Sequence, residues 1–66
     1  MENTLAAIAT EWAEAYGTEA AEWIKSAALC HERKLYKAAN MADQFAKDAA
    51  YKAASYANFV LSINET

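Results

Sequence analysis

Apolar residues recur along this chain at the spacing of an α-helix. Leu5, Ile8 and Trp12 are three or four positions apart, which places them on one side of a helix at about 100° per residue. The phase recurs over residues 23–27 and strengthens near the C-terminal end. There the large apolar members of the stripe are Met41, Phe45, Tyr56, Phe59, Val60 and Ile63. The pattern predicts an all-α protein.

Few positions interrupt a helix in this sequence. The chain has no proline, and its one glycine is Gly17. A glycine suits the left-handed position that follows a helix C-terminus, and Thr18 can then cap the next helix. Asn3 or Thr4 can cap the first helix. We therefore expect a first helix over residues 4–16.

Beyond the glycine, the sequence allows either one very long helix or two shorter ones. An unbroken helix of about 45 residues would be about 68 Å long, which only a coiled coil or an oligomer supports. The stripe is weakest over residues 30–37, and Asn40 suits a new helix start. The sequence therefore predicts helices over residues 18–38 and 41–63, with a boundary that alanine and lysine do not mark strongly.

The size and composition of the chain bear on how it is stabilised. Its 66 residues make a single domain, and a chain this short buries only ~60% of its unfolded surface. With Cys30 as the only cysteine, no disulfide can form within one chain. The 18 alanines favour helices that approach closely but bury little apolar area. We expect a small helical bundle, with either three helices or a long helical hairpin completed by self-association.

Three observations indicate where the protein works. No run approaches the ~20 apolar residues that cross a bilayer. The start, Met1-Glu2-Asn3, lacks the basic and apolar blocks of a signal peptide, and a lone cysteine suits a reducing compartment. The sequence predicts a cytoplasmic protein that does not contact membranes.

The residue types that perform catalysis or bind metals are sparse. The one histidine, His31, stands between Cys30 and Glu32. Adjacent residues on a helix point about 100° apart, so these three cannot converge on one ion or form a catalytic pair. A single glycine cannot form a phosphate-binding loop. We therefore predict no metal, no cofactor and no enzymatic activity.

Charge is distributed unevenly along the chain, whose net charge is −3. Residues 1–22 contain five acidic residues and no lysine or arginine, whereas residues 23–66 contain six basic and four acidic residues. The N-terminal part could occupy a basic groove of a partner protein, although an ordinary solvated helix surface explains the same pattern. The acidic candidates for partner binding are Glu11, Glu14, Glu19 and Glu22.

A second apolar side appears in the middle of the chain. Leu29 and Tyr36 are seven residues apart and lie opposite the stripe that contains Trp23. A helix that is apolar on two sides must bury both, either inside its own bundle or against a partner. Further candidate contacts are Trp12, Trp23 and Arg33, because tryptophan, tyrosine and arginine most often dominate interface energies.

The densest basic segment suggests a different site. In a continuous helix Arg33 and Lys37 lie one turn apart, and Lys34 is adjacent, so this patch could bind a phosphate or a carboxylate. It is too small for duplex nucleic acid, and a net charge of −3 opposes such binding. Copies in a symmetric oligomer could combine their patches into one anion site.

These features favour a noncatalytic protein-binding module, an inhibitor or adaptor that acts through a helix face. In size, acidity and helicity the chain resembles small phage- or mobile-element-encoded proteins that bind and block a host protein. The alternative is an oligomer that sequesters a small anionic ligand such as a nucleotide. A structural assembly piece without a ligand is a third hypothesis.

Overall fold

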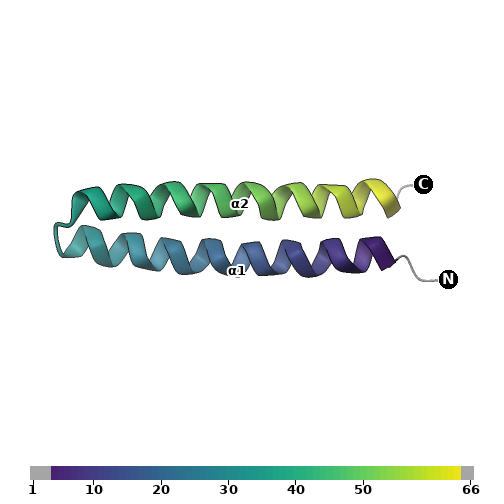
Figure 1. Cartoon of the computed structure of the whole chain (residues 1–66), viewed down its shortest axis with the longest axis horizontal. Helices are drawn as coiled ribbons and strands as arrows, with labels where there is room; N and C mark the ends of the chain where they lie inside the picture. The colour runs from purple at the N-terminus through teal and green to yellow at the C-terminus, as the bar shows by residue number, and fades with distance from the viewer. Residues whose placement is uncertain (1–3, 65–66) are drawn as a thin grey trace.

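The chain folds into two antiparallel α-helices of equal length. The computed structural model describes residues 4–64, and the side chains of residues 4–63. Helix α1 spans Thr4–Glu32 and helix α2 spans Tyr36–Asn64, and residues 33–35 join them (Figure 1). The start of α1 and the end of α2 lie together at the end of the hairpin opposite the turn. The predicted all-α class and the helical hairpin are confirmed.

The predicted three-helix arrangement is wrong, because no helix ends at Gly17. This glycine lies inside α1 and does not have a positive φ. The hydroxyl of Thr18 donates to the carbonyl oxygen of Glu14 at 3.1 Å, a bond typical of a helix interior rather than of a cap. A glycine weakens a helix by only about 1 kcal/mol relative to alanine, which is too little to end one that packs along its whole length.

The turn forms earlier than the predicted boundary near residue 40. The amide of Leu35 donates to the carbonyl oxygen of Cys30 at 2.8 Å, and that of Lys34 donates to His31 at 3.0 Å. These two bonds, together with a φ of 62° at Lys34, form a Schellman motif. Lysine here takes the left-handed position that glycine usually occupies. The predicted boundaries 18–38 and 41–63 are therefore replaced by a break at residues 33–35.

Other predicted helix starts also change. Asn40 and Asp43 lie inside α2 rather than at the start of a third helix. The carbonyl of Leu35 accepts a 2.9 Å bond from the amide of Ala39, so α2 starts immediately after the turn. Thr4, one of the two predicted caps, is the first residue of α1. Asn3, the other, lies outside the described residues.

Alanine forms the contact between the two helices. Every buried side chain among residues 4–63 is an alanine: Ala6, Ala9, Ala20, Ala27, Ala39, Ala42, Ala46 and Ala49. Half-buried residues continue the same spacing of three and four: Ala13, Tyr16, Trp23 and Cys30 in α1, and Ala53, Tyr56, Val60 and Ile63 in α2. We call these sixteen positions the seam. Their seven-residue repeat is that of an antiparallel coiled coil.

Aromatic pairs fix the register of the two helices. The rings of Trp12 and Tyr56 are 5.2 Å apart in an edge-to-face arrangement, and those of Trp23 and Phe45 are 4.9 Å apart. Trp23 follows Trp12 by eleven residues, and Phe45 precedes Tyr56 by the same eleven residues. The register between the two helices is therefore the same at both pairs.

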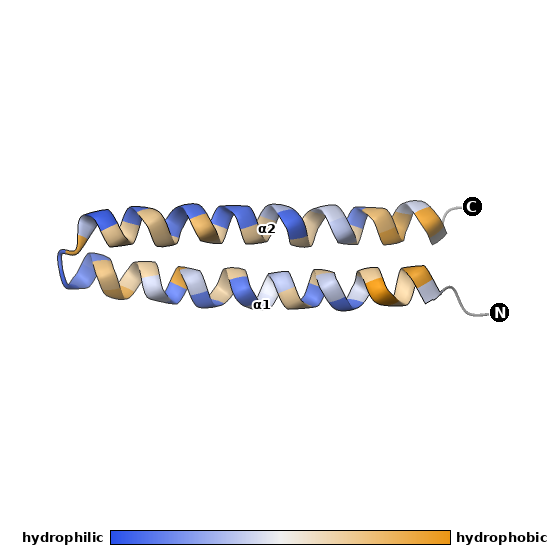
Figure 2. Ribbon diagram, viewed as in Figure 1, coloured by the Kyte–Doolittle hydropathy of each residue, from blue (hydrophilic) through white to orange (hydrophobic). Residues whose placement is uncertain are grey.

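The large apolar side chains were predicted to form the core, and this prediction is wrong, because they lie at the margins of the hairpin. None of the described large side chains is fully buried, and Trp12 is 50% exposed. Hydrophilic residues follow the edge of α2 that is turned away from α1 (Figure 2). No helix within the described residues combines the length and apolarity that crossing a membrane requires.

Candidate functional site: an exposed apolar face

The seam divides the hairpin surface into two broad sides. On each helix, the residues that stand immediately before the seam positions in the sequence form one row, the preceding row. The residues that stand immediately after the seam positions form another, the following row. His31 and Asp43 both belong to following rows, and His31 Nε2 is 3.3 Å from Asp43 Oδ2. The two following rows therefore share one side of the hairpin, and the two preceding rows share the other.

Large apolar side chains concentrate on the side of the preceding rows. Seven of these sixteen positions have a large apolar residue, and all seven are exposed. They are Leu5, Ile8, Trp12 and Leu29 from α1 and Met41, Phe45 and Phe59 from α2. We call this set the apolar face. It draws on both helices and extends over most of the hairpin's length.

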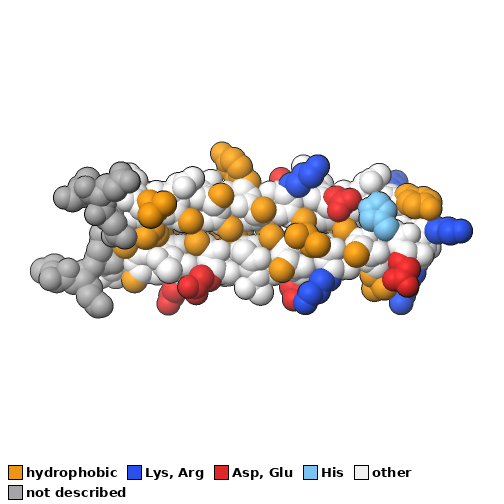
Figure 3. Space-filling view, turned by 180° about the vertical axis from the view of Figure 1, so that it is seen from behind, with side chains coloured by type: hydrophobic (Ala, Val, Ile, Leu, Met, Phe, Trp, Pro, Cys, Tyr) orange, Lys and Arg blue, Asp and Glu red, His pale blue; other side chains and the backbone are white. Residues whose placement is uncertain are grey.

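The opposite side is built from smaller and more polar residues. Among the described positions of its two rows, the large apolar residues are Ile24 and Leu61. Figure 3 shows this side, with small hydrophobic side chains along the seam, charged and a few larger hydrophobic side chains near the margins, and the histidine beside a carboxylate. The hairpin is therefore amphipathic as a whole, although each helix has a modest apolar stripe.

The apolar face is large for a single chain. Its seven side chains are 41–57% exposed. Because a large apolar side chain presents about 200 Å² when free, they leave roughly 650 Å² open to water. The seven residues form two clusters, one near the open end of the hairpin and one near the turn, and Glu19, Glu22, Asp48 and Lys52 lie between them. Exposed apolar patches of a few hundred Å² on soluble proteins often mark interaction sites. The face is therefore the strongest candidate functional site on the described part of the chain.

The four predicted acidic contacts do not form one patch. Glu19 and Glu22 belong to the preceding row and border the apolar face, whereas Glu14 belongs to the following row on the other side. Glu11 lies between them on the outer surface of α1. Glu22 is 3.9 Å from the ammonium of Lys25, one turn along the same helix. The acidic surface is therefore the solvated back of α1, with two carboxylates at the edge of the apolar face.

Three other predicted contacts separate in space. Leu29 joins the apolar face. Tyr36 begins α2 on the opposite side, where its ring centroid is 6.4 Å from that of His31. Arg33 is exposed in the turn. Because Leu29 and Tyr36 lie on different helices, the seven-residue spacing that linked them does not describe one surface.

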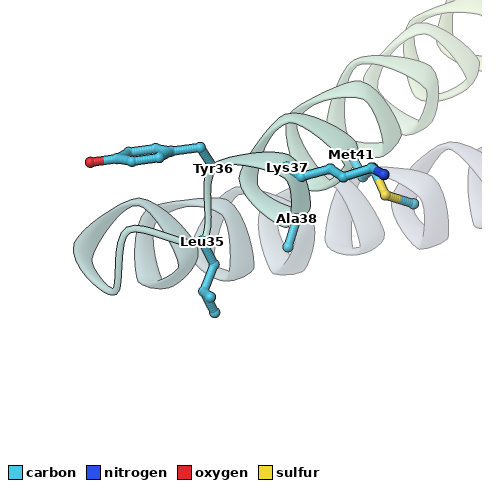
Figure 4. A pocket seen from close by; sticks show the side chains of 5 residues that line it. All are labelled: Leu35, Tyr36, Lys37, Ala38 and Met41. Atoms are coloured by element: carbon cyan, nitrogen blue, oxygen red, sulfur yellow. The ribbon is translucent and has the colours of Figure 1, made fainter.

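The predicted anion-binding residues gather at the turn without forming a common pocket. Arg33 and Lys34 precede α2 and Lys37 lies in its first turn, so the expected single helix face is wrong. A shallow hollow of about 410 Å³ here is lined by Leu35, Tyr36, Lys37, Ala38 and Met41 (Figure 4). Its one basic residue is Lys37, and the ring of Tyr36 points away from Met41.

Cys30 and His31, which have the most reactive side chains, both contact other parts of the hairpin. Cys30 is a half-buried seam residue, and His31 pairs with Asp43 across the turn end of the hairpin. Within the described residues, no three histidine, cysteine or acidic side chains gather as a metal site would require.

Comparisons with known proteins give no independent indication of function. No protein-family model, curated protein or solved structure matches this chain. What it does must therefore be inferred from its own residues, and the apolar face is the feature to explain.

The apolar periodicity predicted most members of the apolar face to be core, and only Leu29 and Trp12 were also predicted to contact a partner. Met41, Phe45 and Phe59 were missed as surface residues because their spacing is that of a core stripe. The alanines beside them form the actual core. A usable signal was present, since each of these three residues directly precedes a seam alanine or valine.

Proposed function

We propose that the protein is a noncatalytic protein-binding module, an inhibitor or adaptor, that acts by burying the apolar face against a helical surface. The supporting observation is the asymmetry between the two sides of the hairpin. Seven large apolar residues line one side, against two in the described rows of the other. Trp12, Phe45 and Phe59 are the central contacts of this interface, because aromatic residues often dominate interface energies.

The pairing of the chain's reactive residues also supports a noncatalytic role. His31 bonds to Asp43 rather than to Cys30, and the thiol of Cys30 belongs to the half-buried seam. His31 therefore has a carboxylate beside it but does not bond to the thiol of Cys30. The anion-sequestering alternative stays a prediction, and the hollow at the turn includes only one of its three bases, Lys37.

A site-specific photo-crosslinker tests the proposed interface directly. A benzophenone amino acid at Phe45 is compared with the same group at Tyr51, which is 75% exposed on the outer side of α2. Each replacement exchanges one aromatic side chain of α2 for another, so the two variants should fold equally well. We expect discrete protein adducts from position 45 and little product from position 51, read by denaturing gel and mass spectrometry.

A charged substitution then tests whether the crosslinked adducts depend on the apolar face. Phe59→Glu should abolish crosslinking from position 45, because burying a carboxylate without a partner is unfavourable. Tyr51→Glu should leave it intact, and far-UV circular dichroism confirms that both variants stay helical. Equal adducts from positions 45 and 51, or adducts that survive Phe59→Glu, contradict the proposal.

A further inference from the structure

We propose that the apolar face is covered by the apolar face of a second copy of this chain, in a two-fold dimer whose axis runs parallel to the helices. This inference rests on the proposed function and names the partner of the same site. Each α1 then packs on α2 of the other copy, and both turns lie at the same end. The product is an antiparallel four-helix bundle.

The area of the face suits such a pairing. A stable protein interface buries about 800 Å² on each partner, and the apolar side chains alone offer roughly 650 Å² of that surface. The single hairpin has little other stabilisation, because its buried side chains within residues 4–63 are all alanine. A second copy supplies the burial of large side chains that the hairpin lacks.

The register within the hairpin determines which residues meet. Trp12 lies level with Tyr56, and Trp23 lies level with Phe45. At 1.5 Å per residue, Phe59 is therefore within one helical turn of the level of Trp12. By the same measure Leu29 is level with Met41, and Glu19 with Lys52, each within one turn. A two-fold axis along the hairpin brings residues of equal level together across the interface.

Charge selects this arrangement over its head-to-tail alternative. Glu19 and Lys52 lie in the preceding rows near the midpoints of α1 and α2. With the axis along the helices, Glu19 faces Lys52 of the second copy, and symmetry makes two such pairs, while Glu22 comes level with Asp48 at the outer edge of the same interface. With the axis across them, each α1 packs on the other α1, so Glu19 meets Glu19 and Lys52 meets Lys52.

These two charges are available for pairing between copies. Within residues 4–63, Glu19 forms no ion pair with a lysine or an arginine. The ammonium of Lys52 is 5.3 Å from the ring centroid of Tyr16 rather than beside a carboxylate. Each group is therefore free to pair with its counterpart on a second copy.

Sedimentation velocity on the purified full chain gives the first test. We expect a species of twice the 7.2 kDa chain mass, converted to monomer by Phe59→Glu but not by Tyr51→Glu. A monomer at 100 μM, or an assembly larger than two chains, overturns the inference.

Charge reversal tests the direction of the two-fold axis. Glu19→Lys and Lys52→Glu should each raise the dimer dissociation constant roughly tenfold to hundredfold, because each turns two attractions into two repulsions. The double variant Glu19→Lys with Lys52→Glu should restore the wild-type value. Glu11→Lys, on the outer surface of α1, is the control and should change little. Single variants that dimerise as tightly as wild type contradict the proposed axis.

A distance measurement tests the same geometry without altering the interface. Spin labels are placed at Lys37→Cys in a Cys30→Ala background, where alanine suits the seam. Turns at the same end give a separation of about 30 Å or less, whereas the head-to-tail dimer separates the labels by about 40 Å or more, given the length of the helices. A distance in the longer class overturns the proposed arrangement.

The outcomes separate this inference from the proposed function. A monomer whose position 45 still crosslinks to a different protein overturns the self-pairing and leaves the protein-binding function in place. A dimer that survives Phe59→Glu uses another surface and overturns the self-pairing, and the crosslinks from position 45 then decide the protein-binding function separately.

Discussion

Gly17 occupies an ordinary helical position that alanine could fill. It lies inside α1 without a positive φ, and a Cβ added there has no atom within 4 Å. Glycine loses more backbone freedom on folding than alanine does. We therefore predict that Gly17→Ala raises the free energy of unfolding by about 0.5–1 kcal/mol, measured by urea titration at one fixed protein concentration.

The matched control reverses the change at another exposed position of the same helix. Ala21→Gly should lower the free energy of unfolding by about 1 kcal/mol. A destabilising Gly17→Ala would instead place residue 17 in a left-handed conformation, as the sequence analysis expected of a helix end. The sign of this single measurement therefore distinguishes one long α1 from two short helices.

The periodicity of apolar residues predicted where helices form more accurately than the capping and breaking residues predicted where they end. Gly17 is the strongest breaker in the chain, yet the helix continues through it. The actual turn has Lys34 in a left-handed conformation, where the sequence has neither the glycine nor the asparagine that usually marks it. Packing of α1 against α2 along the seam outweighs a residue preference of about 1 kcal/mol. The turn position could not be derived from residue preferences alone.

At the scale of the helices, alanine defines the contact surface. The series Ala6, Ala13, Ala20 and Ala27 recurs at every seventh residue, and Ala39, Ala46 and Ala53 do the same in α2. This repeat was visible in the sequence. The large apolar residues predicted a different core, because such residues usually form one. Their spacing indicated the correct class of structure but the wrong set of buried residues.

A packing experiment tests the alanine seam. Ala49 is 2% exposed, whereas Ala54 in the same helix is exposed on the side opposite the apolar face. We predict that Ala49→Leu lowers the free energy of unfolding by about 1–3 kcal/mol, because the added methyl groups have no space between the helices. Ala54→Leu should change it by less than about 0.5 kcal/mol. Chemical denaturation followed by circular dichroism measures both.

The comparison also has a clear contrary outcome. If Ala49→Leu were as stable as wild type, or more so, the helices would be able to separate and accept larger side chains at the seam. The close contact between the two rows of alanine would then be incorrect, and so would the surface position of the apolar face.

For the whole molecule, the exposed face could not be predicted before the register was known. The rows that precede the seam become one side of the hairpin only because α1 and α2 are antiparallel and in step. His31 and Asp43, which the sequence gave no reason to pair, show which rows share a side. The amphipathic surface therefore belongs to the paired helices and cannot be recognised in either helix alone.

Self-association predicts how thermal stability depends on concentration. A partner that binds only the folded chain stabilises it by mass action. We expect the unfolding midpoint to rise by roughly 10 °C over a hundredfold increase in protein concentration. Circular dichroism melts measure this, and Phe59→Glu should remove the dependence. A wild-type midpoint that stays constant over this range indicates a monomer.

The position of the two helix ends has a mechanical consequence. Because the start of α1 and the end of α2 lie together (Figure 1), a force pulling them apart acts on one layer of the seam at a time. Each layer is small, since methyl contacts are individually weak. Tension between its two ends would therefore unzip the hairpin at low force, whereas a pull along the helices in opposite directions would load all layers together.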